Sequence, residues 1–131
     1  MAFYSDSESY YANMRSLFAC VKDNYPEATD AIGKSHMNIR MRTTAPAGDI
    51  IILGRERPVR TVYGENGVKP DLDIEMTADT FHKILLGDLG LRTALGSGQM
   101  KVKGSIWKAL ALSELFRVSQ KCYPDIVKRQ G

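Results

Sequence analysis

The order of apolar and polar residues first predicts an amphipathic helix over residues 5–25. Its apolar positions recur at spacings of three and four, which places them on one face, and they are Tyr11, Met14, Leu17, Phe18 and Val21. Ser5 followed by Glu8 fits a capping box, in which each side chain satisfies a free backbone N–H. Pro26 ends this helix and begins a short second one, which Gly33 would close.

The pattern then changes to strict alternation over residues 36–42, which is typical of a strand with one wet face. We expect one set of side chains to be buried, namely Met37, Ile39 and Met41. We expect their neighbours to be exposed, namely Asn38, Arg40 and Arg42. Further strands are predicted at Ile50–Leu53, Val59–Tyr63, Asp71–Met76 and Met100–Gly104.

Three more helices are predicted in the second half of the chain. Thr77 is a natural N-cap for a helix that Gly87 would close. A short helix is expected over residues 91–95. The last helix runs from about Trp107 to Tyr123, where Pro124 interrupts it.

This order of elements predicts an α+β fold with a five-stranded, mainly antiparallel sheet. The connections between the middle strands are short, which favours antiparallel pairing. The helices must cover the apolar face of the sheet, and residues 1–131 are read as a single domain. No repeat, linker or low-complexity segment interrupts the sequence.

Composition and charge narrow the functional classes. The chain has 131 residues, is 44% hydrophobic and 25% charged, and carries a net charge of +3. The basic residues are scattered rather than clustered, so we expect no nucleic-acid partner. No run approaches the ~20 apolar residues of a membrane span, and the N-terminus lacks a signal-peptide pattern. We therefore expect a cytoplasmic protein, in which Cys20 and Cys122 are reduced thiols.

Chemistry-bearing residues are few. Asp71, Asp73 and Glu75 share one strand face, where they could bind a cation, but an exposed face paired with Arg40 or Arg42 explains them better. The two histidines, His36 and His82, have no neighbour at metal-ligand spacing, and no phosphate-binding or nucleophile motif is present. We expect a protein that is not an enzyme and that holds no cofactor and no metal.

The last predicted helix carries an apolar arc wider than the roughly 100° that a core-facing helix needs. The arc consists of Ala111, Leu112, Leu115, Phe116, Val118, Cys122 and Tyr123. It should therefore contact the sheet and a further surface, which could be a ligand, another helix or a second subunit. Six methionines also suit an adaptable apolar surface.

The second half of the sequence resembles the sterol carrier protein type-2 family. Pro70–Thr77 is similar to its proline, aspartate and alternating strand, and Asp79–Gly87 to the helix that follows. Ala94–Gly104 is similar to its signature, a small-residue loop that leads into a lysine-alternating strand ended by glycine. Leu95, Ser105 and Trp107 depart from the family pattern, which bears on the identity of the ligand and not on the fold.

The resemblance implies a hydrophobic cavity between sheet and helices that holds a fatty acid, a fatty acyl-CoA or a sterol-like ligand. The residues it places around that ligand are Phe81, Ile84, Leu85, Leu91, Ala94, Leu95, Met100, Leu112, Leu115 and Phe116. We expect non-catalytic lipid binding, and transfer that needs at most transient membrane contact. The alternative is a protein-interaction or dimerisation module without a lipid, which leaves a homodimer open.

Overall fold

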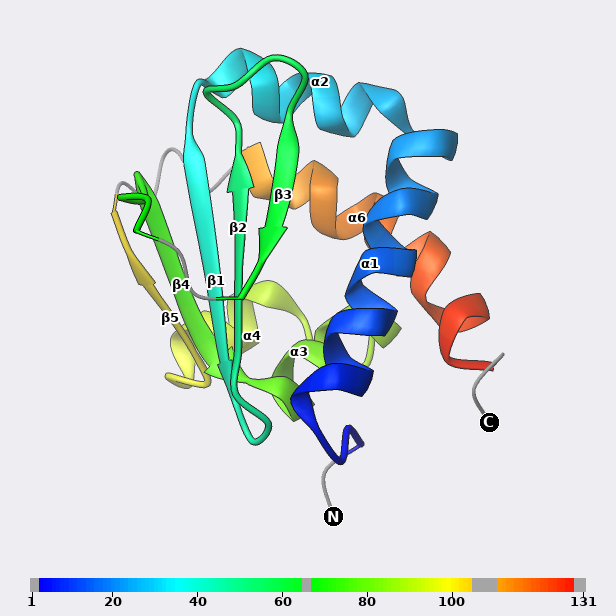
Figure 1. The fold of residues 1–131 in the computed structure, drawn as a ribbon. Helices are drawn as coiled ribbons and strands as arrows, with labels where there is room; N and C mark the ends of the chain where they lie inside the picture. Colours follow the sequence, from blue (N-terminus) through cyan, green and yellow to red (C-terminus); the bar gives the residue numbers. More distant parts are fainter. Residues whose placement is uncertain (1–2, 65–66, 105–110, 129–131) are drawn as a thin grey trace.

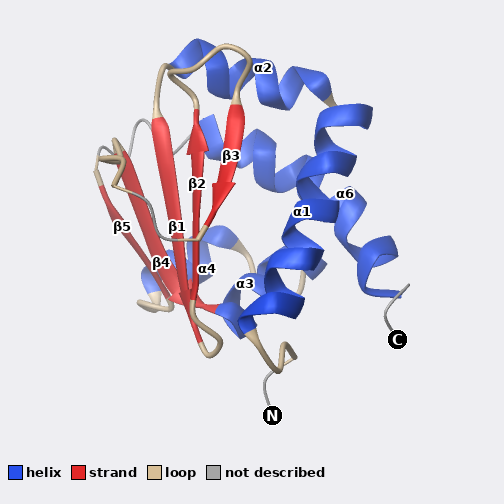
Figure 2. Cartoon of the chain, viewed as in Figure 1, coloured by secondary structure: helices blue, strands red, loops and turns tan. Residues whose placement is uncertain are grey.

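A computed structural model describes residues 3–64, 67–104 and 111–128. It forms two layers, a sheet and a set of helices on one side of it (Figures 1 and 2). The helices are α1 (Ser7–Asn24), α2 (Pro26–Ser35), α3 (Ala78–Leu86), α4 (Leu91–Gly96) and α6 (Ala111–Lys128). The strands are β1 (Asn38–Thr44), β2 (Gly48–Leu53), β3 (Arg60–Tyr63), β4 (Leu72–Thr77) and β5 (Met100–Lys103).

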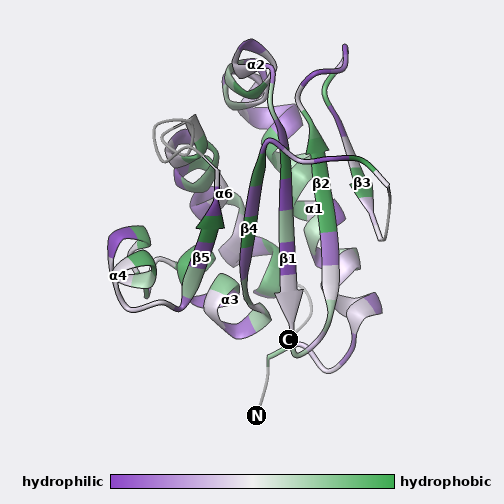
Figure 3. Cartoon of the chain, turned by 90° about the vertical axis from the view of Figure 1, so that its left-hand side faces the viewer, coloured by the Kyte–Doolittle hydropathy of each residue, from purple (hydrophilic) through white to green (hydrophobic). Residues whose placement is uncertain are grey.

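The five strands lie in the order β3-β2-β1-β4-β5. Three of the four pairings are antiparallel, and β1 with β4 is parallel. The predicted α+β class and mainly antiparallel sheet are confirmed. The central pair is parallel, and residues 67–71 run across the helix-free face of the sheet before β4 begins (Figure 3).

The inward side chains of β1 are those that the alternation predicts. Met37, Ile39 and Met41 are each at most 2% exposed. We expected Asn38, Arg40 and Arg42 to be exposed, but they are more buried than that: each is half-buried. Arg40 pairs with Asp49, and Arg42 with Asp73 and Glu75, so neighbouring strands cover much of each outward side chain.

The helix-free face is partly apolar, which the sequence pattern does not indicate. Ile51 and Leu53 lie opposite Arg40 and Asn38, so they share the outward face of the sheet. They are nevertheless only 0% and 4% exposed. Residues 67–71 run across this face of the sheet on the way to β4 (Figure 3).

On the other face, α6 packs against α1, α2 and α3. These three neighbours account for the wide apolar arc, so the further surface that it contacts is made of other helices. The helix continues through Pro124 to Lys128, although the sequence predicted an end at Tyr123. Ile126, only 6% exposed, gains burial from that extra turn. The predicted start at Trp107 lies outside the described residues.

The expectation of two reduced thiols is wrong, because Cys20 and Cys122 form a disulfide between α1 and α6. Their Cα atoms are 6.2 Å apart, within the range that a disulfide spans. Their separation of 102 positions in the sequence does not predict this proximity, which comes from the packing of the first helix on the last.

The helix caps agree with the sequence in one case and differ in another. Thr77 caps α3 by accepting from the backbone N–H of Thr80, as predicted, and Gly87 closes it with a φ of 82°. For α1 the capping residue is Asp6 rather than Ser5, since the Asp6 carboxylate accepts from the Ser9 N–H at 2.7 Å. Ser5 and Asp6 are adjacent and both are good capping residues, so the sequence pattern does not distinguish which of them caps α1.

Candidate functional site

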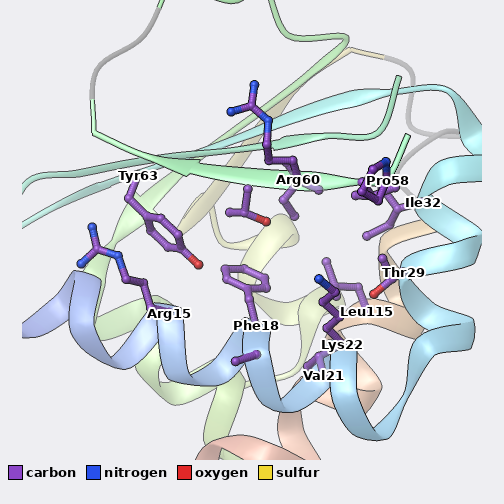
Figure 4. Close-up of a pocket in the computed structure, with 14 residues that line it drawn as sticks. Arg15, Phe18, Val21, Lys22, Thr29, Ile32, Pro58, Arg60, Tyr63 and Leu115 are labelled. Atoms are coloured by element: carbon purple, nitrogen blue, oxygen red, sulfur yellow. The ribbon is translucent and has the colours of Figure 1, made fainter. Parts of the chain in front are cut away.

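A groove of about 390 Å³ opens at the β3 edge of the sheet, between the strands and the helices α1 and α2 (Figure 4). We call it the edge groove. Its lining residues are Arg15, Phe18, Ala19, Val21, Lys22, Thr29, Ile32, Ile52, Pro58, Val59, Arg60, Thr61, Tyr63 and Leu115. The volume lies within the roughly 300–1,000 Å³ typical of small-molecule sites.

Periodicity explains how the chain builds these walls. Arg15, Phe18, Ala19 and Lys22 follow one another at helical spacings of three, one and three, so α1 presents them as one stripe. Ile52 lies opposite Thr61 in the antiparallel β2–β3 pair, so both face the same side. β3 is a short edge strand of 4 residues with no neighbour on its far side in the described sheet, which leaves the groove open there.

The rim of the edge groove carries cations that lack a carboxylate partner. The Arg15 guanidinium carbon lies 4.8 Å from the ring centroid of Tyr63. Within the described residues, neither Arg15 nor Lys22 has a carboxylate at ion-pair distance, whereas Arg60 pairs with Glu56 at 2.9 Å. Figure 4 shows the Arg60 head group pointing away from the groove, beyond the strand. Arg15 and Lys22 are therefore the charges that a bound molecule would meet.

Burial raises the pKa of the Tyr63 phenol to about 12, although the nearby Arg15 acts in the opposite direction. The phenol therefore stays protonated and neutral at physiological pH. The positive charge of Arg15 is not compensated by its aromatic neighbour, and the rim remains electropositive.

A second, much smaller space adjoins the groove deeper between sheet and helices. This core hollow measures about 10 Å³ and is lined by Leu17, Phe18, Met41, Phe81, Leu85, Leu115, Phe116 and Ser119. It is about the size of one water molecule, and its lining is almost entirely apolar. Phe18 and Leu115 line both spaces, so these two side chains separate the groove from the hollow.

The structure distributes the ten predicted contact residues over several places. Leu115 lines the edge groove, and Phe81, Leu85, Leu115 and Phe116 meet around the core hollow. Four others are buried without lining either space, namely Ile84, Ala94, Met100 and Leu112. Leu91 is half-buried, and Leu95 is 45% exposed. Their role as ligand contacts stays a prediction.

Sequence reasoning missed the walls that α1 and β3 contribute, above all Arg15, Lys22 and Tyr63. A signal was available in α1, because Arg15 and Lys22 flank Phe18 at distances of three and four residues. Phe18 belongs to the predicted apolar face of this helix, yet it is only half-buried. An aromatic residue between two cations on one helix face indicates a boundary position rather than a core position.

The other candidate side chains have structural partners. Arg42 bonds to Asp73 at 3.0 Å, and Arg55 pairs with Asp71, so the carboxylate row is held by arginines as the sequence favoured. His82 accepts from or donates to the Tyr123 hydroxyl through Nδ1 at 2.7 Å. Phe3 stacks on the His82 ring at 3.8 Å, so this histidine fastens the N-terminal segment to α3 and α6.

With this geometry in place, the class of protein is clear from the fold: a one-sheet, helix-covered module with an apolar groove at the sheet edge. A family model described as the SCP-2 sterol transfer family matches residues 18–117, and the chain belongs to that family. Membership supports a general role in lipid binding or transfer. No individually curated protein matches the sequence.

Solved structures agree on the fold. The sterol carrier protein domain 2 of Helicoverpa armigera has a TM-score of 0.68 at 18% identity, covering 92% of this chain and 95% of its own. Sterol carrier protein 2 from Yarrowia lipolytica, in its apo form, has a TM-score of 0.62 at 15% identity, covering 79% and 87%. The sec-alkylsulfatase Pisa1 from Pseudomonas sp. has a TM-score of 0.53 at 26% identity, and covers 67% of this chain but only 13% of that enzyme.

Among the described residues, no helix combines the length and the hydropathy that crossing a bilayer requires.

Proposed function

We propose that this protein binds a single-chain anionic lipid in the edge groove, reversibly and without chemical change to the ligand. One observation carries the proposal: an apolar groove of about 390 Å³ is bordered by Arg15 and Lys22, two cations without a carboxylate partner among the described residues. Apolar walls suit an acyl chain, and the cations suit its acidic end.

The energetics explain why the cations matter. Burying ten methylenes contributes roughly 8 kcal/mol at ~0.8 kcal/mol each, which only equals the net free energy of a micromolar complex. Association also costs several kcal/mol of lost translational and rotational freedom. A hydrogen bond to a charged group adds about 1.5–3 kcal/mol, so an anionic head group decides whether binding is measurable.

The same argument ranks the ligand classes that family membership leaves open. A sterol offers no charge to Arg15 or Lys22, whereas a fatty acid or a fatty acyl derivative does. A long chain would reach the core hollow if Phe18 and Leu115 changed rotamer, because those two side chains line both spaces. In that arrangement Phe81, Leu85 and Phe116 become contacts of the chain end.

The test compares two ligands that differ only in the head group, hexadecanoate and hexadecanol. We expect the protein to prefer hexadecanoate, and the double variant Arg15→Gln/Lys22→Gln to lose about tenfold in affinity for it while hexadecanol is unaffected. Lys101→Gln, on the exposed β5 position outside the groove, is the matched control and should change neither affinity.

Equal affinity for the two ligands in the parent protein would contradict an anionic ligand. Equal loss for both ligands in the double variant would show that Arg15 and Lys22 act on the shape of the groove rather than on charge.

A further inference from the structure

A polar depression surrounds the disulfide where α1 packs against α6 (Figure 1). This disulfide pocket has a volume of about 470 Å³ and is lined by Ser16, Cys20, Asn24, Tyr25, Lys121, Cys122, Asp125 and Ile126. None of these residues lines the edge groove or the core hollow, so the pocket is a separate space. Because both cysteines belong to its lining, a small molecule in the pocket would lie against the S–S bond while the protein stays folded.

The two sulfur-bearing residues differ in their access to that pocket. Cys20 is half-buried, whereas Cys122 is only 4% exposed. In thiol–disulfide exchange a thiolate must approach one of the two sulfur atoms, and access decides which sulfur is attacked. Cys20 is therefore the sulfur that an incoming thiolate meets, and Cys122 is the one that leaves.

Asn24 holds the Cys20 sulfur and polarises it. Its side-chain Nδ2 donates to the Cys20 carbonyl oxygen at 2.9 Å and to the Cys20 Sγ at 3.5 Å. A hydrogen bond donated to the sulfur withdraws electron density from it, which favours attack by a thiolate. The same donor stabilises the negative charge on Cys20 when this residue is later released as a thiolate.

The pocket also carries one cation and one carboxylate that no other charge neutralises. Lys121 and Asp125 are exposed and one helical turn apart on α6, and neither forms an ion pair in the described part of the chain. The Lys121 ammonium lies 5.5 Å from the ring centroid of Tyr25, another lining residue. Side chains at this helical spacing are roughly 5–6 Å apart at Cβ, which suits the carboxylate and the ammonium of one zwitterionic amino-acid group.

We propose that the Cys20–Cys122 disulfide is a redox site that exchanges with a small thiol bearing a zwitterionic amino-acid group, as glutathione does, bound in the disulfide pocket. The thiolate attacks the Cys20 Sγ, the S–S bond of the protein breaks, and Cys122 leaves as a thiolate that takes up a proton. A second thiolate attacks the small-molecule sulfur of the mixed disulfide, and Cys20 leaves and is protonated in turn. Two small thiols are thereby oxidised to their disulfide, and their two electrons reduce the protein. This site is independent of lipid binding in the edge groove.

The first experiment follows reduction of the parent protein by glutathione at several urea concentrations, all well below its unfolding transition. We expect the rate to be proportional to the glutathione concentration and to vary less than about twofold with urea, because the pocket exists in the folded state. A rate that rises with urea in step with the unfolded fraction, or no reduction at all, would overturn the proposal.

The second experiment locates the mixed disulfide. The reaction is quenched with acid at early times, and glutathione is mapped to each cysteine by mass spectrometry of peptides. We expect at least about tenfold more glutathione on Cys20 than on Cys122, as their exposure requires. The protein unfolded in urea is the control and should show both sites. Equal labelling in the folded protein would contradict attack from the pocket.

The third experiment tests recognition of the thiol with two reductants, glutathione and the uncharged 2-mercaptoethanol. Lys121→Gln should slow reduction by glutathione about threefold, the size of an exposed charge interaction, and leave reduction by 2-mercaptoethanol unchanged. Lys128→Gln is the matched control, because Lys128 is an exposed lysine on the same helix that does not line the pocket. Equal slowing of both reductants by Lys121→Gln, or equal effects of the two variants, would overturn a zwitterionic thiol as the partner.

Discussion

At the scale of single residues, Leu115 is the position that separates a ligand space from an ordinary core. It is 5% exposed and lines both the edge groove and the core hollow. We predict that Leu115→Trp abolishes binding of a fluorescent fatty acid while stability holds, since the indole can occupy space that the lipid would use. Titration of the fluorescent ligand and thermal melting of the variant measure the two effects.

Leu112→Trp supplies the control on the same helix. Leu112 is 3% exposed and lines neither space, so the added volume must displace packed neighbours at a cost of about 1–3 kcal/mol. If the two variants lost equal stability, Leu115 would be an ordinary core residue, and the space beside it would not be a ligand site.

His82 predicts a dependence of stability on pH. Burial lowers the pKa of its imidazole below the ordinary value of about 6.5, although Asp79 and Asp88 act in the opposite direction. The unfolded chain then binds a proton more readily than the folded one. Stability should therefore be complete above about pH 6.5 and fall as the pH drops through the interval down to the lowered pKa.

Urea unfolding of the parent protein and of His82→Gln, each at pH 7.5 and pH 5, measures this effect. The parent should lose more stability between the two conditions than the variant, whose side chain does not titrate. A parallel loss in both proteins would assign the acid sensitivity to other groups instead, such as Glu56 and Glu114, whose carboxyl pKa values are lowered by hydrogen bonds from Arg60 and Arg117.

At the scale of elements, the disulfide joins α1, which forms one wall of the edge groove, to α6, which supplies its floor through Leu115. Its two cysteines are 102 residues apart. In the chain-entropy model a closed loop of that length stabilises a fold by up to about 4.7 kcal/mol. We predict that Cys20→Ser/Cys122→Ser lowers the free energy of unfolding by a large part of that amount.

Urea unfolding with and without a reducing agent checks this prediction. Reductant should destabilise the parent protein as much as the double substitution does, and it should leave the double variant unchanged. A parent protein indifferent to reductant would mean that the bond does not form in solution, and would restore the initial expectation of two thiols. The expected cytoplasmic location remains a prediction, and the disulfide favours an oxidising environment instead.

At the scale of the whole molecule, a ligand that binds only the folded state must raise the melting temperature. At a free ligand concentration of 100 times Kd the stabilisation is about 2.7 kcal/mol. For a domain of this size that corresponds to roughly 10 °C. We predict a shift of this order with a saturating fatty acyl ligand, measured by calorimetry, and no shift with a neutral sterol. The reverse ranking would contradict a ligand anchored by Arg15 and Lys22.

The sequence by itself determined the elements and the faces they bury. Alternation at Met37, Ile39 and Met41, the cap at Thr77 and the closing Gly87 depend on neighbours within a few residues, and such short-range signals survive without a tertiary structure. The motifs of the second half likewise identified the family that the family model matches.

The tertiary structure alone decided what depends on contacts between distant segments. The disulfide, the parallel β1–β4 pair and the burial of Ile51 each arise where segments far apart in the chain meet, and periodicity carries no record of such meetings. The same holds for the site. Arg15 and Lys22 are among the scattered basic residues of the sequence, and only the packing of α1 against the sheet edge brings them together with Tyr63 around an apolar groove.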